Sequence, residues 1–287
     1  MKRTHACMAV LVAGSLLLSC STRTTDPNDS GWRFLPGHVE SLNVPAFRGG
    51  RPCWIYLPPG YATSGKRYPV LYVNDGAEIF DPGGIVQANR ICEDLIRGGE
   101  IVPIIMVAIS VPAEPDTIRF WDYAPWEDFY PFYSRRVLGG GGDAYVRAVR
   151  DSLKPEVDRR FRTLPDSAHT GMAGYSLGGL ISAYAGLAYH GTFGLVGACS
   201  PTYGWGLGTP DIYTTAEAGG YPNLISRYYQ DTGYPYDNYI GQMEQLLVGH
   251  GFIAGMNFES LTLDGATHSV PAWKHRFPDM LRFLFRP

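Results

Sequence analysis

Three features are scarce in the sequence. Basic residues do not outnumber acidic ones, cysteines are few, and long apolar segments are rare. The 24 Lys and Arg residues are outnumbered by 27 Asp and Glu residues, which gives a net charge of −3. Nucleic-acid binding generally depends on a basic surface that displaces counterions from phosphate, so this balance argues against a nucleic-acid partner. Since no positively charged run occurs in the chain, adsorption to an anionic membrane surface is not expected either.

Cysteine is scarce: only Cys53, Cys92 and Cys199 lie outside the N-terminal segment. An odd number of thiols permits at most one disulfide and leaves a free thiol. Each of the three has apolar neighbours, which favours buried free thiols over a disulfide. No Cys/His spacing resembles a metal site, so we expect neither a metal nor a cofactor.

The N-terminal segment has the features of an export signal. Lys2 and Arg3 precede an apolar run, residues 6–18, that is too short to span a bilayer but suits a secretory signal. The run ends in Leu17-Leu18-Ser19-Cys20, which resembles the lipobox of bacterial lipoproteins. That resemblance implies cleavage after residue 19 and acylation of Cys20. The alternatives are a plain signal peptide with an incidental cysteine, or an uncleaved anchor.

This interpretation divides the chain into three parts: a lipoprotein signal peptide over 1–19, a polar tether over 20–31, and a folded domain over 32–287. The tether is rich in Pro, Asp and Ser. The full chain has 45% hydrophobic residues, which is ample material for a packed core, and one domain suffices. We therefore expect an exported lipoprotein of the cell envelope, periplasmic or anchored in the outer membrane, which touches the membrane only through its lipid.

Apolar runs and helical stripes alternate along the rest of the chain, with Gly and Pro between them. Two strands around Gly49-Gly50 form an expected hairpin, and continuous apolar runs such as 104–110 are typical of strands buried on both faces. This alternation predicts an α/β fold with a mostly parallel, doubly wound sheet and an antiparallel N-terminal hairpin. We expect strands at 38–47, 51–57, 69–74, 104–110, 170–173, 195–200, 224–230 and 257–263, and helices at 85–97, 143–161 (kinked at Pro155), from 177, 238–248 and after 271.

Residues 111–142 show no clear periodicity but are dense in Trp, Tyr, Phe and Pro, which favours an ordered functional loop. Arg119 in this loop could hold an anionic or hydroxyl-rich group. Its aromatic residues, together with two tryptophans elsewhere, could stack on a sugar or phenolic ring. The candidate substrate-binding residues are Arg119, Trp121, Tyr123, Trp205 and Trp273. The competing interpretation is that the rings fold the loop onto the sheet and that Arg119 caps carbonyl groups.

The residues Gly174-Tyr175-Ser176-Leu177-Gly178 fit the pattern G-x-S-x-G. A serine at a tight strand-to-helix turn has strained backbone geometry and needs glycine neighbours to avoid steric collision. The motif lies between an expected short strand and a helix of small residues, which is the context that a nucleophile requires. The backbone N–H of Leu177 would then point at the reacting carbonyl, and the helix N-terminus favours a developing oxyanion.

A serine hydroxyl needs a base, and His268 is the best-placed histidine. It follows the last expected strand, at the carboxyl end where parallel sheets assemble their sites. The acid should lie between the serine and the histidine in the chain. Asp237, on a loop, has better reach than Asp231 at a strand end, so we favour Asp237 and keep Asp231 as the alternative.

These segments resemble the esterase D, or "putative esterase", family of α/β-hydrolases over nearly the whole predicted domain. The family includes S-formylglutathione hydrolases, feruloyl, acetyl-xylan and siderophore esterases, and mycolyltransferases. The segments that carry the resemblance are residues 56–61, 68–76, 153–155, 174–179 and 200–201, with His268 and Trp273. The resemblance implies an α/β-hydrolase fold, a second oxyanion N–H from Ala77, and an acid at Asp237.

We therefore expect a serine carboxylic-ester hydrolase with a Ser176-His268-Asp237 triad. Predicted export favours an envelope-accessible ester, such as an acylated saccharide or a siderophore, over a cytosolic glutathione ester. Two alternatives stay open. One is acyl transfer to a saccharide acceptor, and the other is a catalytically silent protein that binds a glycan or siderophore.

Overall fold

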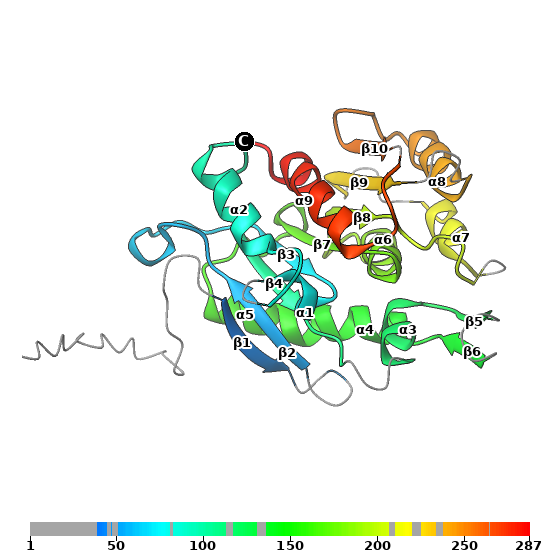
Figure 1. Ribbon diagram of the computed structural model, residues 1–287, viewed down its shortest axis with the longest axis horizontal. Coiled ribbons are helices and arrows are strands. Elements are labelled where there is room, and N and C mark those ends of the chain that lie inside the picture. The colour runs from blue at the N-terminus through cyan, green and yellow to red at the C-terminus, as the bar shows by residue number, and fades with distance from the viewer. Residues whose placement is uncertain are drawn as a thin grey trace, which may run out of the picture. The chain divides into compact units, whose positions relative to one another are not determined.

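The computed structural model (Figure 1) describes residues 39–44, 47, 51–80, 83–112, 117–130, 136–206, 210–219, 225–233, 238–263 and 265–287. All of these belong to one compact unit, Arg33–Pro287. The predicted signal peptide, the tether with Cys20, and the candidate acid Asp237 lie outside the described residues. No helix in these ranges is long and apolar enough to cross a bilayer.

An eight-stranded sheet forms the centre of the fold, in the order β1-β2-β4-β3-β7-β8-β9-β10. Strand β2 pairs antiparallel with both β1 and β4, whereas every other pairing in this sheet is parallel. The predicted mostly parallel sheet with an antiparallel N-terminal hairpin is therefore confirmed. The strands are β1 (Val39–Val44), β2 (Arg51–Tyr56), β3 (Val70–Val73), β4 (Ile105–Ile109), β7 (Thr170–Tyr175), β8 (Leu195–Cys199), β9 (Arg227–Thr232) and β10 (Phe258–Thr262).

Helices cover both faces of this sheet. The two neighbouring helices α2 (Ala88–Arg97) and α9 (Val270–Phe285) pack on one face (Figure 1), where Leu71 and Val73 join their buried side chains in one core. The alternate residues of β3 face the other side, and Asn74 there bonds α6 (Leu177–Ala188) through Ser182. Further helices are α1 (Gly76–Ile79), α7 (Ile212–Glu217) and α8 (Asn238–Gly249), with short turns η1 (Tyr61–Thr63) and η3 (Ser167–His169).

The expected helix over 143–161 is divided into three parts. It consists of α4 (Gly142–Ala148), a π-helical turn η2 (Val149–Leu153) and α5 (Lys154–Arg160). The predicted irregularity at Pro155 takes this form because proline cannot donate to the preceding turn, which widens instead.

The aromatic loop has more secondary structure than its sequence indicates. It contains the helix α3 (Thr117–Tyr123) and a two-stranded antiparallel sheet of β5 (Glu127–Tyr130) and β6 (Arg136–Gly139). The helix and strands are too short to produce a visible hydrophobic period. Where the segment is described, this secondary structure replaces the irregular loop that the sequence led us to expect.

The three cysteines of the described chain, Cys53, Cys92 and Cys199, are free and buried, as predicted. Burial raises the pKa of the Cys53 thiol to about 12, above its ordinary value. These thiols are therefore neutral packing groups at neutral pH.

Candidate active site

The turn at Ser176 joins β7 to α6 and has unusual backbone geometry. Ser176 has φ 59° and ψ −124°, a conformation that costs a residue with a side chain about 1–3 kcal/mol. The flanking glycines make the turn possible. A Cβ on Gly174 would lie 2.7 Å from the carbonyl carbon of Gly178, and a Cβ on Gly179 would lie 3.0 Å from the carbonyl oxygen of Cys199. Such strain at a strand-to-helix turn is the geometry expected of a nucleophile.

Hydrogen bonds hold the Ser176 turn against the end of β8. The Ser176 N–H donates to the Cys199 carbonyl at 3.0 Å, and the Thr202 N–H donates to the Ser176 carbonyl at 3.1 Å. The Ser176 hydroxyl lies 3.3 Å from the Thr202 hydroxyl, and the serine side chain is only partly buried. Thr202 was not among the predicted site residues, since a lone Thr after Ser-Pro carries no sequence signal.

Leu177 and Ala77, the predicted oxyanion donors, each occupy the first turn of a helix. Leu177 is the first residue of α6 and Ala77 is the second residue of α1. N–H groups in a first helical turn have no acceptor within the helix, which leaves them available to an anion. The turn into α1 is pressed onto the end of β4, because a Cβ on Gly76 would lie 2.7 Å from the Ile109 carbonyl carbon.

Hydrogen bonds of the Asn74 side chain, which follows β3, connect these two helix starts. The Asn74 amide donates to the Gly178 carbonyl at 3.2 Å and to the Ser182 hydroxyl at 3.1 Å. Tyr145 from α4 donates to the Asn74 amide oxygen at 2.6 Å. Because Asn74 is fully buried, this network is rigid, and it holds the Ala77 turn against the Ser176 turn.

Arg119 lies beside the Ala77 turn and forms a two-pronged ion pair with Asp75. Its Nε lies 2.7 Å from Asp75 Oδ1, and its Nη2 lies 2.9 Å from Asp75 Oδ2. The same Nη2 lies 3.4 Å from the Tyr175 carbonyl, next to Ser176. Partial burial opposes the charge on Arg119, but the Asp75 carboxylate raises its pKa above the ordinary value. Arg119 therefore links the Ala77 turn to the Ser176 turn.

Asp75 itself is strained, with φ 60° and ψ 41°, and its N–H donates to the Tyr123 hydroxyl at 2.9 Å. The Arg119 guanidinium also faces the Tyr123 ring, 5.4 Å from its centroid. Tyr123 is fully buried, so its hydroxyl is a fixed acceptor that supports the Asp75 turn from inside the core. These contacts match the alternative interpretation of the loop, in which its residues hold the fold together.

Three of the five candidate substrate-binding residues are buried, which corrects their predicted role. Tyr123, Trp205 and Trp273 are 0–2% exposed, so their rings cannot stack on a ligand where they lie. Trp205 donates to the Trp126 carbonyl at 2.9 Å, and Trp273 packs on the Tyr175 ring with centroids 4.4 Å apart. Sequence reasoning missed this because tryptophan serves cores and binding surfaces equally well.

Trp121 is the exception, with 41% of its surface exposed. It lines a cavity of about 360 Å³ together with Thr117, Ile118, Glu127 and Val137. This ring remains available to a ligand, and its role stays a prediction.

His268 lies on the loop between β10 and α9, with an exposed side chain. A Cβ on Gly233 would lie only 1.9 Å from the Ala266 carbonyl oxygen, so this loop rests on the end of β9. Ser176 follows β7, which runs parallel to β8, β9 and β10. Ser176 and His268 are thus at the same edge of the sheet, at the carboxyl ends of its parallel strands.

Asp231, the alternative acid, is fully buried within β9 and committed elsewhere. Its carboxylate accepts from Arg276 Nη1 at 2.6 Å, from the Ser200 N–H at 3.0 Å and from the Tyr229 hydroxyl at 3.0 Å. Burial raises the pKa of Asp231, and these three donors oppose the rise. Because its oxygens are engaged by Arg276 on α9, Ser200 after β8 and Tyr229 on β9, Asp231 forms a structural ion pair.

Within the described ranges, no three His, Cys, Asp or Glu residues are grouped so that they could hold a metal ion.

The strand order, the helices on both faces and the strained serine turn together define an α/β-hydrolase fold. Residues 46–218 match the model of the family described as "Putative esterase". The chain belongs to this family.

Individual relatives share parts of the chain. It is 29% identical over 155 residues to the uncharacterized protein YbbA of Bacillus subtilis, covering 54% of this chain and 58% of YbbA. It is 27% identical over 266 residues to an endo-1,4-beta-xylanase/feruloyl esterase of Xylanibacter ruminicola, covering 89% of this chain and 30% of that protein. The chain thus spans less than two thirds of the length of either relative.

Solved structures share the fold. An IroE-like serine hydrolase from Shewanella oneidensis superposes with a TM-score of 0.68 at 20% identity, over 86% of this chain and 80% of that chain. The enterobactin esterase FES from Shigella flexneri gives a TM-score of 0.65 at 20% identity, over 86% and 59% of the two chains.

Proposed function

We propose that this protein is a serine carboxylic-ester hydrolase with Ser176 as the nucleophile. The observation that carries this proposal is the backbone of Ser176: a strained conformation, enforced by glycine contacts, that directs its side chain to the carboxyl edge of the sheet. Membership in the esterase family supports the same reaction.

His268 is the proposed base. It accepts the Ser176 proton as the serine oxygen attacks the ester carbonyl, and then gives this proton to the departing alcohol. Water attacks the resulting acyl-enzyme while His268 accepts a proton from it, and His268 returns this proton to the Ser176 oxygen as the acid leaves. The N–H groups of Leu177 and Ala77 stabilise the oxyanion in both steps.

Asp237 is the proposed acid that orients His268 and stabilises its cation. The close approach of Gly233, four residues before Asp237, to Ala266 in the loop of His268 supports this choice. The four residue steps from Gly233 to Asp237 span at most about 14 Å, so Asp237 has the reach for this role. The structural ion pair of Asp231 favours the same choice.

The proposed substrate is an ester outside the cytoplasm, such as an acylated saccharide or a siderophore. The feruloyl esterase and enterobactin esterase among the similar proteins support this class. The proposed lipid anchor on Cys20 would hold the enzyme in the envelope, and loss of acyl labelling in a Cys20→Ala variant tests it.

Turnover of p-nitrophenyl acetate by the wild type and Ser176→Ala tests the reaction itself. We expect at least a 10³-fold loss in Ser176→Ala, as removal of a triad member typically causes. Ser226→Ala, an exposed serine far from the turn, is the matched control. Equal turnover in Ser176→Ala and wild type would refute the proposal, and a panel of feruloyl, acetyl-saccharide and siderophore esters then identifies the substrate class.

A further inference from the structure

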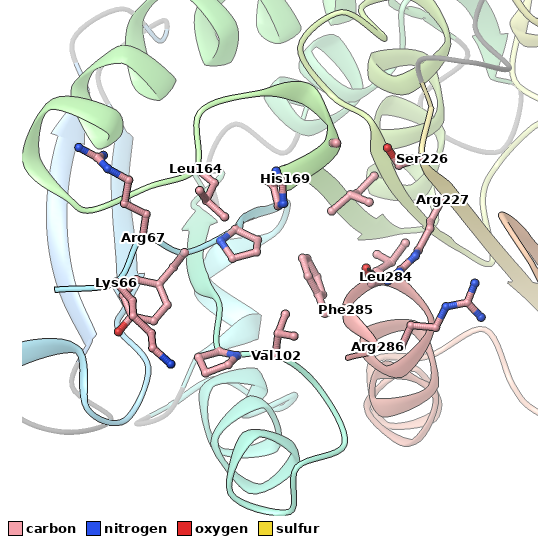
Figure 2. Close-up of a pocket in the computed structure, with 15 residues that line it drawn as sticks. Lys66, Arg67, Val102, Leu164, His169, Ser226, Arg227, Leu284, Phe285 and Arg286 are labelled. Atoms are coloured by element: carbon pink, nitrogen blue, oxygen red, sulfur yellow. Dashed lines mark hydrogen bonds between the residues drawn. The ribbon is translucent and has the colours of Figure 1, made fainter. Parts of the chain in front are cut away.

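A second cavity lies at the opposite edge of the sheet from Ser176. It has a volume of about 510 Å³, within the range of small-molecule sites. Its walls come from the residues just before or at the start of β3, β4, β7, β8 and β9, and from the end of α9 (Figure 2). His169 at this cavity and Ser176 are separated by the length of β7, about 23 Å at 3.3 Å per residue. We call it the basal cavity.

The floor of the basal cavity is apolar. Pro69, Val102, Leu164, Leu195 and Phe285 contribute to it, and Leu195 and Phe285 are almost completely buried. A surface of this kind holds the hydrocarbon part of a ligand, since water gains little by contact with it.

The rim of the basal cavity is basic. Figure 2 shows Lys66 and Arg67 on one side of the apolar floor and Arg227 and Arg286 on the other, with His169 above it. None of the described residues that line the cavity is an Asp or Glu, although His169 Nδ1 lies 2.8 Å from Asp166 Oδ1 just outside it. The rim therefore has a concentrated positive potential that a ligand anion would neutralise.

Arg227 and Arg286 lack carboxylate partners among the described residues. Arg227 Nη1 donates to the Leu284 carbonyl at 2.8 Å, and Arg286 Nη1 donates to the Gly255 carbonyl at 3.1 Å. Burial, together with the neighbouring Arg286, lowers the pKa of Arg227. Both guanidinium groups are partly exposed, and a bound anion would stabilise this like-charged pair.

We propose that the basal cavity binds a small amphiphilic carboxylate, an aliphatic or aromatic acid whose apolar body covers the floor and whose anionic group faces Arg227 and Arg286. A bare inorganic anion would leave the apolar floor uncovered, and an uncharged hydrocarbon would leave the basic rim without a counter-charge. An amphiphilic carboxylate satisfies both. The inference does not depend on the proposed hydrolysis, because no residue of the basal cavity belongs to the candidate active site.

Calorimetric titration with octanoate and with 1-octanol, in low salt without detergent, tests the proposal. Both probes have the same chain length, so their difference reports the anionic group. We expect octanoate to bind at least tenfold more tightly than 1-octanol, because a charge-assisted hydrogen bond contributes about that factor. Raising the salt concentration should weaken octanoate selectively.

Two variants locate the binding. Arg286→Gln should weaken octanoate about tenfold. Ala168→Glu, at an exposed position of the wall, adds a negative charge without removing any hydrogen bond and should abolish octanoate binding. The control is Arg282→Gln on the same helix, whose guanidinium pairs with Glu100 outside the cavity.

Thermal unfolding confirms that each variant is folded. Equal affinity for octanoate and 1-octanol, or octanoate binding that Ala168→Glu leaves unchanged, would overturn the proposal. Binding to vesicles of anionic phospholipid without binding of octanoate would also overturn it, since the basic rim would then bind a lipid headgroup.

Discussion

The ion pair between Arg119 and Asp75 allows a test of whether Arg119 positions the Ala77 turn or binds the substrate. If Arg119 positions the Ala77 turn, Arg119→Gln should lower kcat and leave KM almost unchanged. If Arg119 instead binds the substrate, as its sequence position suggested, the same change should raise KM.

The size of the effect follows from the structure. Arg119→Gln leaves the Asp75 carboxylate, 7% exposed, without its counter-charge. Losing a hydrogen bond to a charged group costs about 1.5–3 kcal/mol, and solvent screens part of the loss because Arg119 is 27% exposed. We expect the free energy of unfolding to fall by about 2 kcal/mol. A displaced oxyanion donor should lower kcat about 10²-fold.

Steady-state kinetics on p-nitrophenyl acetate and denaturant unfolding measure both quantities. The control is Arg159→Gln, because Arg159 makes the same two-pronged contact with Glu156 at 2.9 Å but is 64% exposed. That control should lose much less stability than Arg119→Gln, because solvent screens the exposed pair, and it should lose no activity. Arg119→Lys should have a kcat and a free energy of unfolding between those of wild type and Arg119→Gln, since a lysine ammonium cannot make the two-pronged contact of the guanidinium. An unchanged kcat with a raised KM in Arg119→Gln would refute the positioning role.

Three further predictions concern stability and the edge of the site. Asp231→Asn should lower the free energy of unfolding by about 3–5 kcal/mol, because it leaves the buried Arg276 guanidinium without its counter-charge. Asp237→Asn should instead lower kcat. A large loss of kcat in a folded Asp231→Asn variant would reverse the two assignments. Gly233→Ala should displace the loop of the candidate base and lower kcat, while Gly241→Ala, with open space around it, should not; matching kinetics in the two variants would contradict the close contact. The pKa of Cys53 rises from 9.0 to about 12 on folding, so its contribution to stability is complete below pH 9 and is lost as the pH rises toward 12; urea unfolding at pH 8 and pH 11 should show a drop that Cys53→Ala reduces.

Much of the fold follows from patterns in the sequence. The buried strands β3 and β4 are continuous apolar runs, and G-x-S-x-G marks the turn at Ser176, because only glycine fits its close contacts. The expected strand at 224–230 instead spans Arg227–Thr232, a displacement within the ordinary uncertainty of element boundaries.

The contacts between distant segments could not be predicted. Asp75 and Arg119 are 44 residues apart, and neither has a local pattern that reveals its partner. Burial of Trp273 against Tyr175 is likewise a result of tertiary packing, since the sequence shows an aromatic residue but not the surface it meets. The basal cavity escaped sequence reasoning for the same reason, as its walls come from the starts of five strands.

Covalent labelling of the full chain with a fluorophosphonate, followed by peptide mass spectrometry, examines the central assignment most directly. We expect a single phosphonylated residue, Ser176, and a loss of esterase activity in proportion to labelling. Labelling at another serine, or full activity in a protein whose Ser176 is completely modified, would contradict it.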